Sequence, residues 1–140
     1  MTIEVCSQAH ALSLASAATE RTAIISITST GDPPLTFPRN PNIEAILPLR
    51  FNDLTAEFDE EGFPYGRPLP QQTDLAGLKT FVDRLSCPRL IVHCWAGTSR
   101  SAAVAQAIYR YRGERDQLRP GWAFAPNPLV YELACRELGI

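Results

Sequence analysis

The stretch that decides the fold is Leu90-Ile-Val-His-Cys-Trp-Ala-Gly-Thr-Ser-Arg-Ser101. Its first residues, up to Cys94, form a short, mostly apolar and partly β-branched run, which is typical of a buried strand. Small and polar residues follow, and from residue 99 onward apolar side chains recur at helical spacing. The pattern predicts a strand, a short loop that begins at Cys94, and then a helix.

Such a strand-loop-helix turn has the physical properties of an anion site. The backbone N–H groups of the loop and the N-terminus of the helix would point inward together, which favours a dianion. Cys94 would feel the same positive field, so we expect its pKa to be lowered and its thiolate to be present at neutral pH. Arg100 offers a planar fork of donors for two phosphate oxygens. Gly97 permits a tight, positive-φ backbone close to a ligand.

Further elements are predicted on both sides of this stretch. Residues 3–6, 22–27 and 43–49 are also short apolar runs and are predicted as strands, which we expect to be covered on both faces. Helices are predicted over residues 7–19, over 74–85 with Thr73 as N-cap, over 99–111, and from Pro128, capped by Asn127, to near Gly139. Alternating strands and helices predict an α/β fold, in which one domain over residues 1–140 has a central, mainly parallel sheet flanked by helices.

Two segments have the composition of loops. Residues 31–42 and 60–70 are rich in Gly and Pro. Long ordered loops in compact domains are often functional, so the second segment is predicted as a flap. Together with a turn around residues 120–127, these loops would set the depth of a pocket above Cys94.

Composition and charge exclude several classes of protein. Thirteen basic and fifteen acidic residues give a net charge of −2, which argues against a nucleic-acid or membrane-surface partner. No apolar run approaches the roughly 20 residues of a membrane span, and no Lys or Arg precedes Arg21 as in the basic region of a signal peptide. With four cysteines and no CxxC pair, we expect a soluble protein in the reducing cytoplasm. His10 is the only histidine besides His93, so no metal site is predicted.

The combination His-Cys-x-x-Gly-x-x-Arg-Ser after an apolar strand resembles the signature of the cysteine-based protein tyrosine phosphatases. It is far more specific than Cys-x5-Arg alone. In its small size the chain resembles the compact members of this family, which are the dual-specificity and bacterial tyrosine phosphatases. The resemblance implies a tyrosine phosphatase-like catalytic domain over residues 1–140. It would hydrolyse phosphotyrosine in phosphorylated proteins or peptides, and in the dual-specificity alternative also phosphoserine and phosphothreonine. The reaction would use a cysteinyl-phosphate intermediate and no metal or other cofactor.

The resemblance also implies a role for each residue of the signature. Cys94 would be the nucleophile, which divides a slow hydrolysis into two easier steps. Ser101 would donate a hydrogen bond to the sulfur of Cys94, and His93 would hold the shape of the loop. Arg100 and the backbone of the loop would bind the phosphate and stabilise charge on its oxygens. The loop residues in this set are Trp95, Ala96, Gly97, Thr98, Ser99 and Arg100.

The family also needs a general acid, an Asp on a separate loop that protonates the leaving oxygen. In compact members it lies upstream, just after a strand, so the candidate is Asp53 in Leu49-Arg-Phe-Asn-Asp-Leu54. Its separation from Cys94, 94 − 53 = 41 positions, is longer than the family leads us to expect, and an insertion at residues 60–70 would account for the excess. Asp59 and Asp74 are the alternatives. Asp74 is more simply a first-turn helix residue favoured by the helix dipole.

Other functions use the same kind of scaffold. One alternative is a phosphatase for an inositol phosphate, a lipid or an RNA 5′ phosphate, although Trp95, Ala96, Thr98 and Ser99 supply no loop charge for a polyanion. Another is a phosphate-binding module with weak catalysis, which a missing general acid would support. Cys6, Cys87 and Cys135 are interpreted as packing residues, with a reversible disulfide to Cys94 as the alternative. Trp95 lies either in the pocket or in the core.

Overall fold

The computed structural model describes residues 1–118 and 124–140, so part of the predicted turn around residues 120–127 lies outside the described residues. Its centre is a four-stranded sheet in the order β1-β4-β2-β3, and every pairing between neighbouring strands is parallel. The strands are β1 (Thr2–Ser7), β2 (Thr22–Thr28), β3 (Ile43–Arg50) and β4 (Arg89–Cys94). The predicted α/β domain with a mainly parallel sheet is therefore confirmed.

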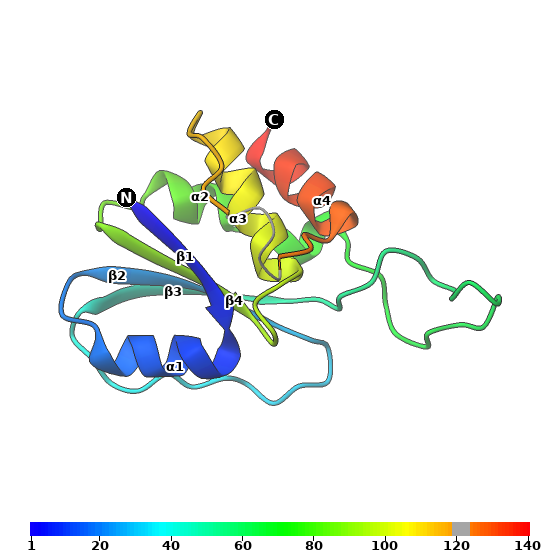
Figure 1. Cartoon of the computed structure of the whole chain (residues 1–140), viewed down its shortest axis with the longest axis horizontal. Helices are drawn as coiled ribbons and strands as arrows, with labels where there is room; N and C mark the ends of the chain where they lie inside the picture. Colours follow the sequence, from blue (N-terminus) through cyan, green and yellow to red (C-terminus); the bar gives the residue numbers. More distant parts are fainter. Residues whose placement is uncertain (119–123) are drawn as a thin grey trace.

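Helices cover both faces of the sheet (Figure 1). On one face lies α1 (Gln8–Ala17), whose Ala11 and Ala15 pack with Ile24 and Ile91 in a small apolar cluster. The larger core fills the other face, beneath α2 (Leu78–Asp83), α3 (Arg100–Tyr111) and α4 (Pro128–Leu138). No helix among the described residues is long and apolar enough to cross a membrane.

The strand order places β4 in the interior of the sheet, between β1 and β2. Parallel strands end at one edge of a sheet, and in open α/β folds ligands bind outside that edge. Cys94, the last residue of β4, pairs with Ser7, the last residue of β1. The loop that follows Cys94 therefore begins at the edge of the sheet where α/β proteins bind ligands.

Two predictions about individual elements are wrong. The strand β3 is not covered on both faces: half-buried or buried residues alternate with exposed ones, and Ile46 is 42% exposed. The strand β3 lies at the end of the strand order, so no further strand pairs with it on one side. Pro48, which lacks an N–H, is tolerated there because no hydrogen bond to a further strand is lost.

The other wrong prediction is a single helix over residues 74–85. A 3-10 turn, η1 (Gln72–Leu75), comes first, and its N-terminus is closed by Asp74 Oδ2, which accepts from the N–H of Gln71 at 2.8 Å. Gly77 then adopts a φ of +89°, which interrupts the helical backbone before α2 begins at Leu78. A left-handed conformation of this kind is accessible to glycine and ends the first turn.

The predicted flap between β3 and η1 has no regular helix or strand, and Figure 1 shows it extending away from the sheet. An isolated antiparallel bridge joins Phe58 to Pro64, and the N–H of Tyr65 donates to the carbonyl of Glu57 at 3.1 Å. At its base, Nδ2 of the buried Asn52 donates to the carbonyl of Pro68 at 3.0 Å. The two ends of the loop are thus fixed close together, beside the carboxyl end of β3.

Candidate functional site

The loop between β4 and α3 is seated against the end of β1. Gly97 has a φ of +76°, and a Cβ placed on it would lie 2.3 Å from the carbonyl carbon of Cys6 and 2.5 Å from the nitrogen of Ser7. Both contacts are with backbone, which cannot rotate away as a side chain can. Only glycine fits this position, because the conformation and the available space both exclude a side chain.

Cys94 is buried at the start of this loop. Its Sγ lies 3.2 Å from Ser101 Oγ and accepts a hydrogen bond from the N–H of Gly97 at 3.3 Å. Burial by itself would raise the pKa of the thiol. The hydroxyl and N–H of Ser101, the N–H of Gly97 and the charge of Arg100 together outweigh burial and lower the pKa of Cys94 below its ordinary value. The arrangement therefore favours a thiolate.

Arg100, the first residue of α3, is buried beside this thiol. Its Nη1 donates to Ser29 Oγ and to the carbonyl of Phe51, both at 2.9 Å, so the guanidinium is anchored to the residues that follow β2 and β3. Its Nε is buried without a hydrogen-bond partner. Among the described residues, no carboxylate forms an ion pair with Arg100. A buried cation with an unused donor is costly unless an anion approaches it.

His93 lies on β4 with no exposed surface and contacts the backbone of the loop. Its Nδ1 is 3.1 Å from the carbonyl oxygen of Cys94, and its Nε2 is 2.6 Å from Ser26 Oγ on β2. Because a carbonyl can only accept, Nδ1 carries the proton and Nε2 accepts from the hydroxyl of Ser26. Burial lowers the pKa of His93, which favours this neutral form. The ring thus ties the first peptide of the loop to the neighbouring strand.

Of the candidate general acids, Asp53 is the one whose contacts reach the loop. Its Oδ1 accepts from Ser99 Oγ and from Asn127 Nδ2, both at 2.8 Å. Asp59 instead accepts from the N–H groups of Glu61 and Phe63 and closes the turn of the flap. Asp74 closes the N-terminus of η1. These contacts bring Asp53 into one cluster with the Cys94 loop and give the other two candidates structural roles.

A surface depression of about 500 Å³ adjoins Asp53. Ser99 lies on one side of it, and Tyr65 and Arg67 of the flap lie on another. The rest of its wall is mixed, with the apolar side chains of Leu54, Ala125, Pro126 and Pro128 beside the polar Thr55 and Asn127. A group bound by the loop therefore has a partly apolar space beside it, in which Arg67 supplies a cation.

The other loop residues and the other three cysteines form no hydrogen bond with Asp53 or Arg100 in the part of the chain that the structure describes. The side chain of Trp95 is 71% exposed, which excludes the alternative of a core position, and Ala96 is exposed next to it. Cys6, Cys87 and Cys135 are buried free thiols. Burial is the largest factor that raises the pKa of Cys6, to about 12. Thr98 is half-buried, and its carbonyl accepts from the N–H of Ala125 at 2.8 Å.

Sequence reasoning missed the contact of Asn127 with Asp53. The predicted role of Asn127 as the cap of the last helix is confirmed, because its Oδ1 accepts from the N–H groups of Leu129 and Val130. Its Nδ2 reaches Asp53 because α4 packs with its N-terminus against the loop. No local sequence signal reports such a contact, since residues 53 and 127 are joined only by the tertiary fold.

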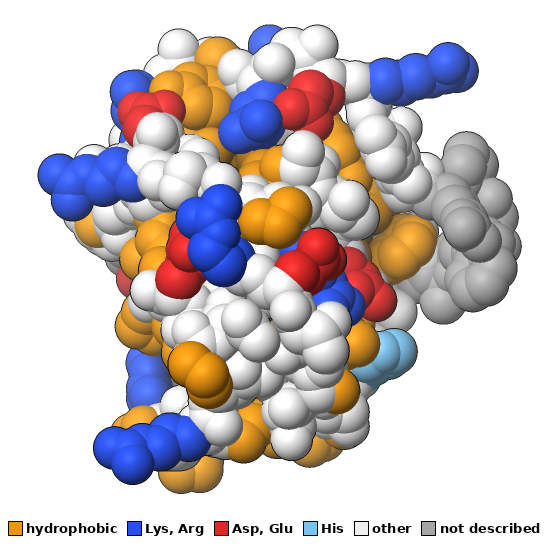
Figure 2. Space-filling view, turned by 90° about the vertical axis from the view of Figure 1, so that its left-hand side faces the viewer, with side chains coloured by type: hydrophobic (Ala, Val, Ile, Leu, Met, Phe, Trp, Pro, Cys, Tyr) orange, Lys and Arg blue, Asp and Glu red, His pale blue; other side chains and the backbone are white. Residues whose placement is uncertain are grey.

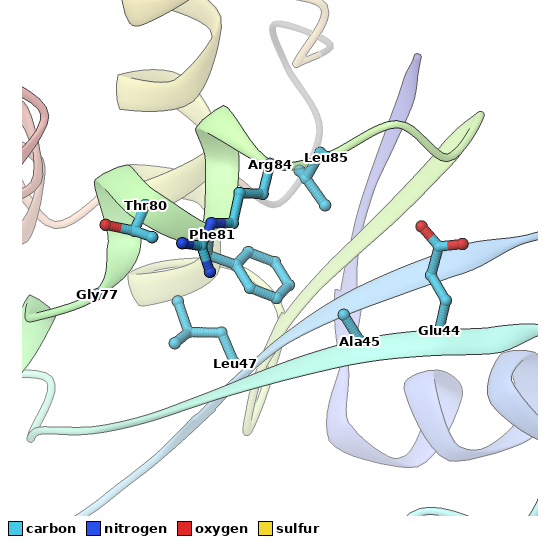
Figure 3. A pocket seen from close by; sticks show the side chains of 8 residues that line it. All are labelled: Glu44, Ala45, Leu47, Gly77, Thr80, Phe81, Arg84 and Leu85. Carbon is cyan, nitrogen blue, oxygen red and sulfur yellow. The ribbon is translucent and has the colours of Figure 1, made fainter.

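A second cavity, of about 360 Å³, lies between β3 and α2 and is lined by Leu47, Phe81, Arg84 and their neighbours, but by none of the predicted site residues (Figure 3). On the face shown in Figure 2, Lys and Arg side chains alternate with Asp and Glu and form no patch of one sign. Residues 1–118 and 124–140 contain no group of three or more His, Cys, Asp or Glu arranged to hold a metal ion.

No family model matches the chain, and no curated protein matches it.

Proposed function

We propose that this protein is a cysteine-dependent phosphomonoester hydrolase of the protein tyrosine phosphatase type, acting on phosphotyrosine in proteins or peptides. The observation that carries the proposal is the buried Arg100, with an unpartnered Nε, next to a thiol whose pKa is lowered. Transfer of a phosphoryl dianion requires a nucleophile and a cation close together, and the loop at residues 94–100 supplies both.

The residues divide the reaction into two steps. In the first, the Cys94 thiolate attacks phosphorus while the phosphorus–oxygen ester bond breaks, and Asp53 gives its proton to the leaving oxygen. In the second, the Asp53 carboxylate takes a proton from water as the water oxygen attacks the phosphocysteine. Inorganic phosphate leaves, and the thiolate is restored. Arg100 and the N–H groups of the loop stabilise charge on the phosphoryl oxygens throughout.

The depression beside Asp53 supports an aryl phosphate as substrate. The leaving oxygen must lie next to the acid that protonates it, so the remainder of the leaving group occupies the space lined by Tyr65 and Pro126. A partly apolar wall with Arg67 as its cation suits the ring of tyrosine better than a highly charged inositol phosphate or the phosphate of an RNA end. A cytoplasmic location, where thiols remain reduced, is part of this proposal.

The test is phosphate release from a phosphotyrosine peptide, measured for the wild type, Cys94→Ser and Asp53→Ala in a buffer that contains a chelator. We expect turnover in the wild type and no detectable turnover in Cys94→Ser, because a serine hydroxyl is not ionised in this site. Asp53→Ala should lose about 100-fold or more in kcat, the range typical of a general acid.

Two results would contradict the proposal. Turnover by Cys94→Ser equal to that of the wild type would exclude Cys94 as the nucleophile. A wild type that binds the phosphopeptide but releases no phosphate would instead indicate a binding module. Normal turnover by Asp53→Ala would leave the phosphatase in place and remove Asp53 as the acid, with Asp59→Ala as the next variant to measure.

A further inference from the structure

Both polar atoms of the Asn127 side chain form hydrogen bonds where α4, the Cys94 loop and Asp53 meet. Its Oδ1 accepts from the N–H groups of Leu129 at 3.0 Å and Val130 at 3.1 Å, and its Nδ2 donates to Asp53 Oδ1 at 2.8 Å and to the carbonyl of Leu54 at 3.2 Å. The residue is 4% exposed. Its two acceptor sites and two donor hydrogens are therefore all engaged.

This network permits only one orientation of the amide. A flipped side chain would place NH₂ against two backbone N–H groups and the amide oxygen against a carboxylate and a carbonyl. The backbone of Asn127 is also fastened to the loop, because its N–H donates to the carbonyl of Ser99 at 3.2 Å. Asp53 thus faces a donor that can neither rotate nor turn into an acceptor.

The consequence concerns the two oxygens of Asp53. Oδ1 receives hydrogen bonds from Asn127 Nδ2 and from Ser99 Oγ. A proton on the side of Oδ1 that faces Asn127 would meet the N–H of the amide, and a proton on the side that faces Ser99 would replace the hydrogen bond that Ser99 donates. A proton on Oδ2 keeps both hydrogen bonds to Oδ1. Ser99 alone does not enforce this choice, since a hydroxyl can also accept a hydrogen bond.

We propose that Asn127 is a positioning residue that holds the proton of Asp53 on Oδ2, the oxygen that protonates the leaving group. This inference rests on the proposed phosphatase activity, with Asp53 as its acid. It assigns Asn127 an effect on the chemical step in addition to its role as the cap of α4.

The test uses two variants that keep the cap. Aspartate and serine are both good N-cap residues, so Asn127→Asp and Asn127→Ser retain an acceptor for the first turn of α4. Each removes the amide donor to Asp53, and only Asn127→Asp adds a charge. Thermal melting checks that both fold like the wild type. The kinetic readout is the dependence of kcat/KM on the leaving-group pKa in a series of aryl phosphates, because this ratio reports the step in which the leaving group departs and a lost general acid harms poor leaving groups most.

We expect both variants to lose about tenfold in kcat/KM on phenyl phosphate and much less on p-nitrophenyl phosphate, whose leaving group needs little protonation. If the rate of both folded variants depends on the leaving-group pKa as it does in the wild type, Asn127 is only a helix cap. A steeper dependence in Asn127→Asp alone would assign the effect to the added charge and would also overturn the inference. Absence of turnover by the wild type on every ester would overturn the proposed function itself, and the inference with it.

Discussion

At the scale of single residues, two separate features of the structure require glycine at position 97. Its φ of +76° and the backbone of Cys6, 2.3 Å from the position that a Cβ would occupy, act independently on any larger residue. Gly113, at the end of α3, has a φ of +66° but no atom within 4 Å of a Cβ. It therefore provides a control in which the conformational penalty acts without the steric one.

We expect Gly113→Ala to lower the free energy of unfolding by about 1–3 kcal/mol, the penalty of a left-handed backbone at a residue with a side chain. Gly97→Ala should lower it by more, because the end of β1 must also move, and it should abolish phosphate release. Urea denaturation of the two variants makes the comparison. Equal losses of stability would show that the loop can move away from β1 without cost.

The ionisation of Cys94 gives a second prediction at this scale. Its folded pKa is lowered, so at a given pH a larger fraction of Cys94 than of an ordinary cysteine is thiolate. The rate of alkylation by iodoacetate should rise through an inflection below that of a free cysteine. Removal of the Ser101 hydroxyl, in Ser101→Ala, should move the inflection upward, since this hydrogen bond is the largest factor that favours the thiolate.

Cys94→Ser identifies the modified residue by mass spectrometry, and Cys6, with a pKa of about 12, should not compete. An inflection at the ordinary cysteine value in the wild type would contradict the role of the loop. An unmoved inflection in Ser101→Ala would contradict the role of Ser101 alone.

At the scale of elements, the success of prediction depends on whether the information is local. Strands β2 and β4 are short, mostly apolar runs, and Asn127-Pro128 is a typical start of a helix, so these strands and the cap of α4 can be predicted from the sequence. The break at Gly77 cannot, because the apolar spacing of residues 75, 78, 82 and 85 continues across it. The exposed face of β3 cannot be predicted for another reason. It follows from the position of β3 at the edge of the sheet, and strand order is a property of the tertiary fold.

At the scale of the whole molecule, the candidate site joins segments that are distant in sequence. The cradle at residues 94–100 is local and predictable, because its residue types are set by the turn itself. The contact of Asp53 with Ser99 and Asn127 depends on the packing of the segment after β3 and of α4 against one edge of the sheet. Spacing along the chain can nominate Asp53 but cannot separate it from Asp59, because the length of the flap obscures the distance to Cys94.

The flap permits a test of that assignment on the intact fold. The N–H of Tyr65 meets the carbonyl of Glu57, so residues 58–64 can be replaced by Asn-Gly, which favours a two-residue hairpin turn. The variant lacks Asp59 but keeps Asp53, Tyr65 and Arg67. We expect its free energy of unfolding to stay within about 1 kcal/mol of the wild type, because shortening a surface loop changes closure entropy little. Its kcat on a small aryl phosphate should be unchanged. A loss of about 100-fold in a variant that still folds cooperatively would transfer the role of general acid from Asp53 to Asp59.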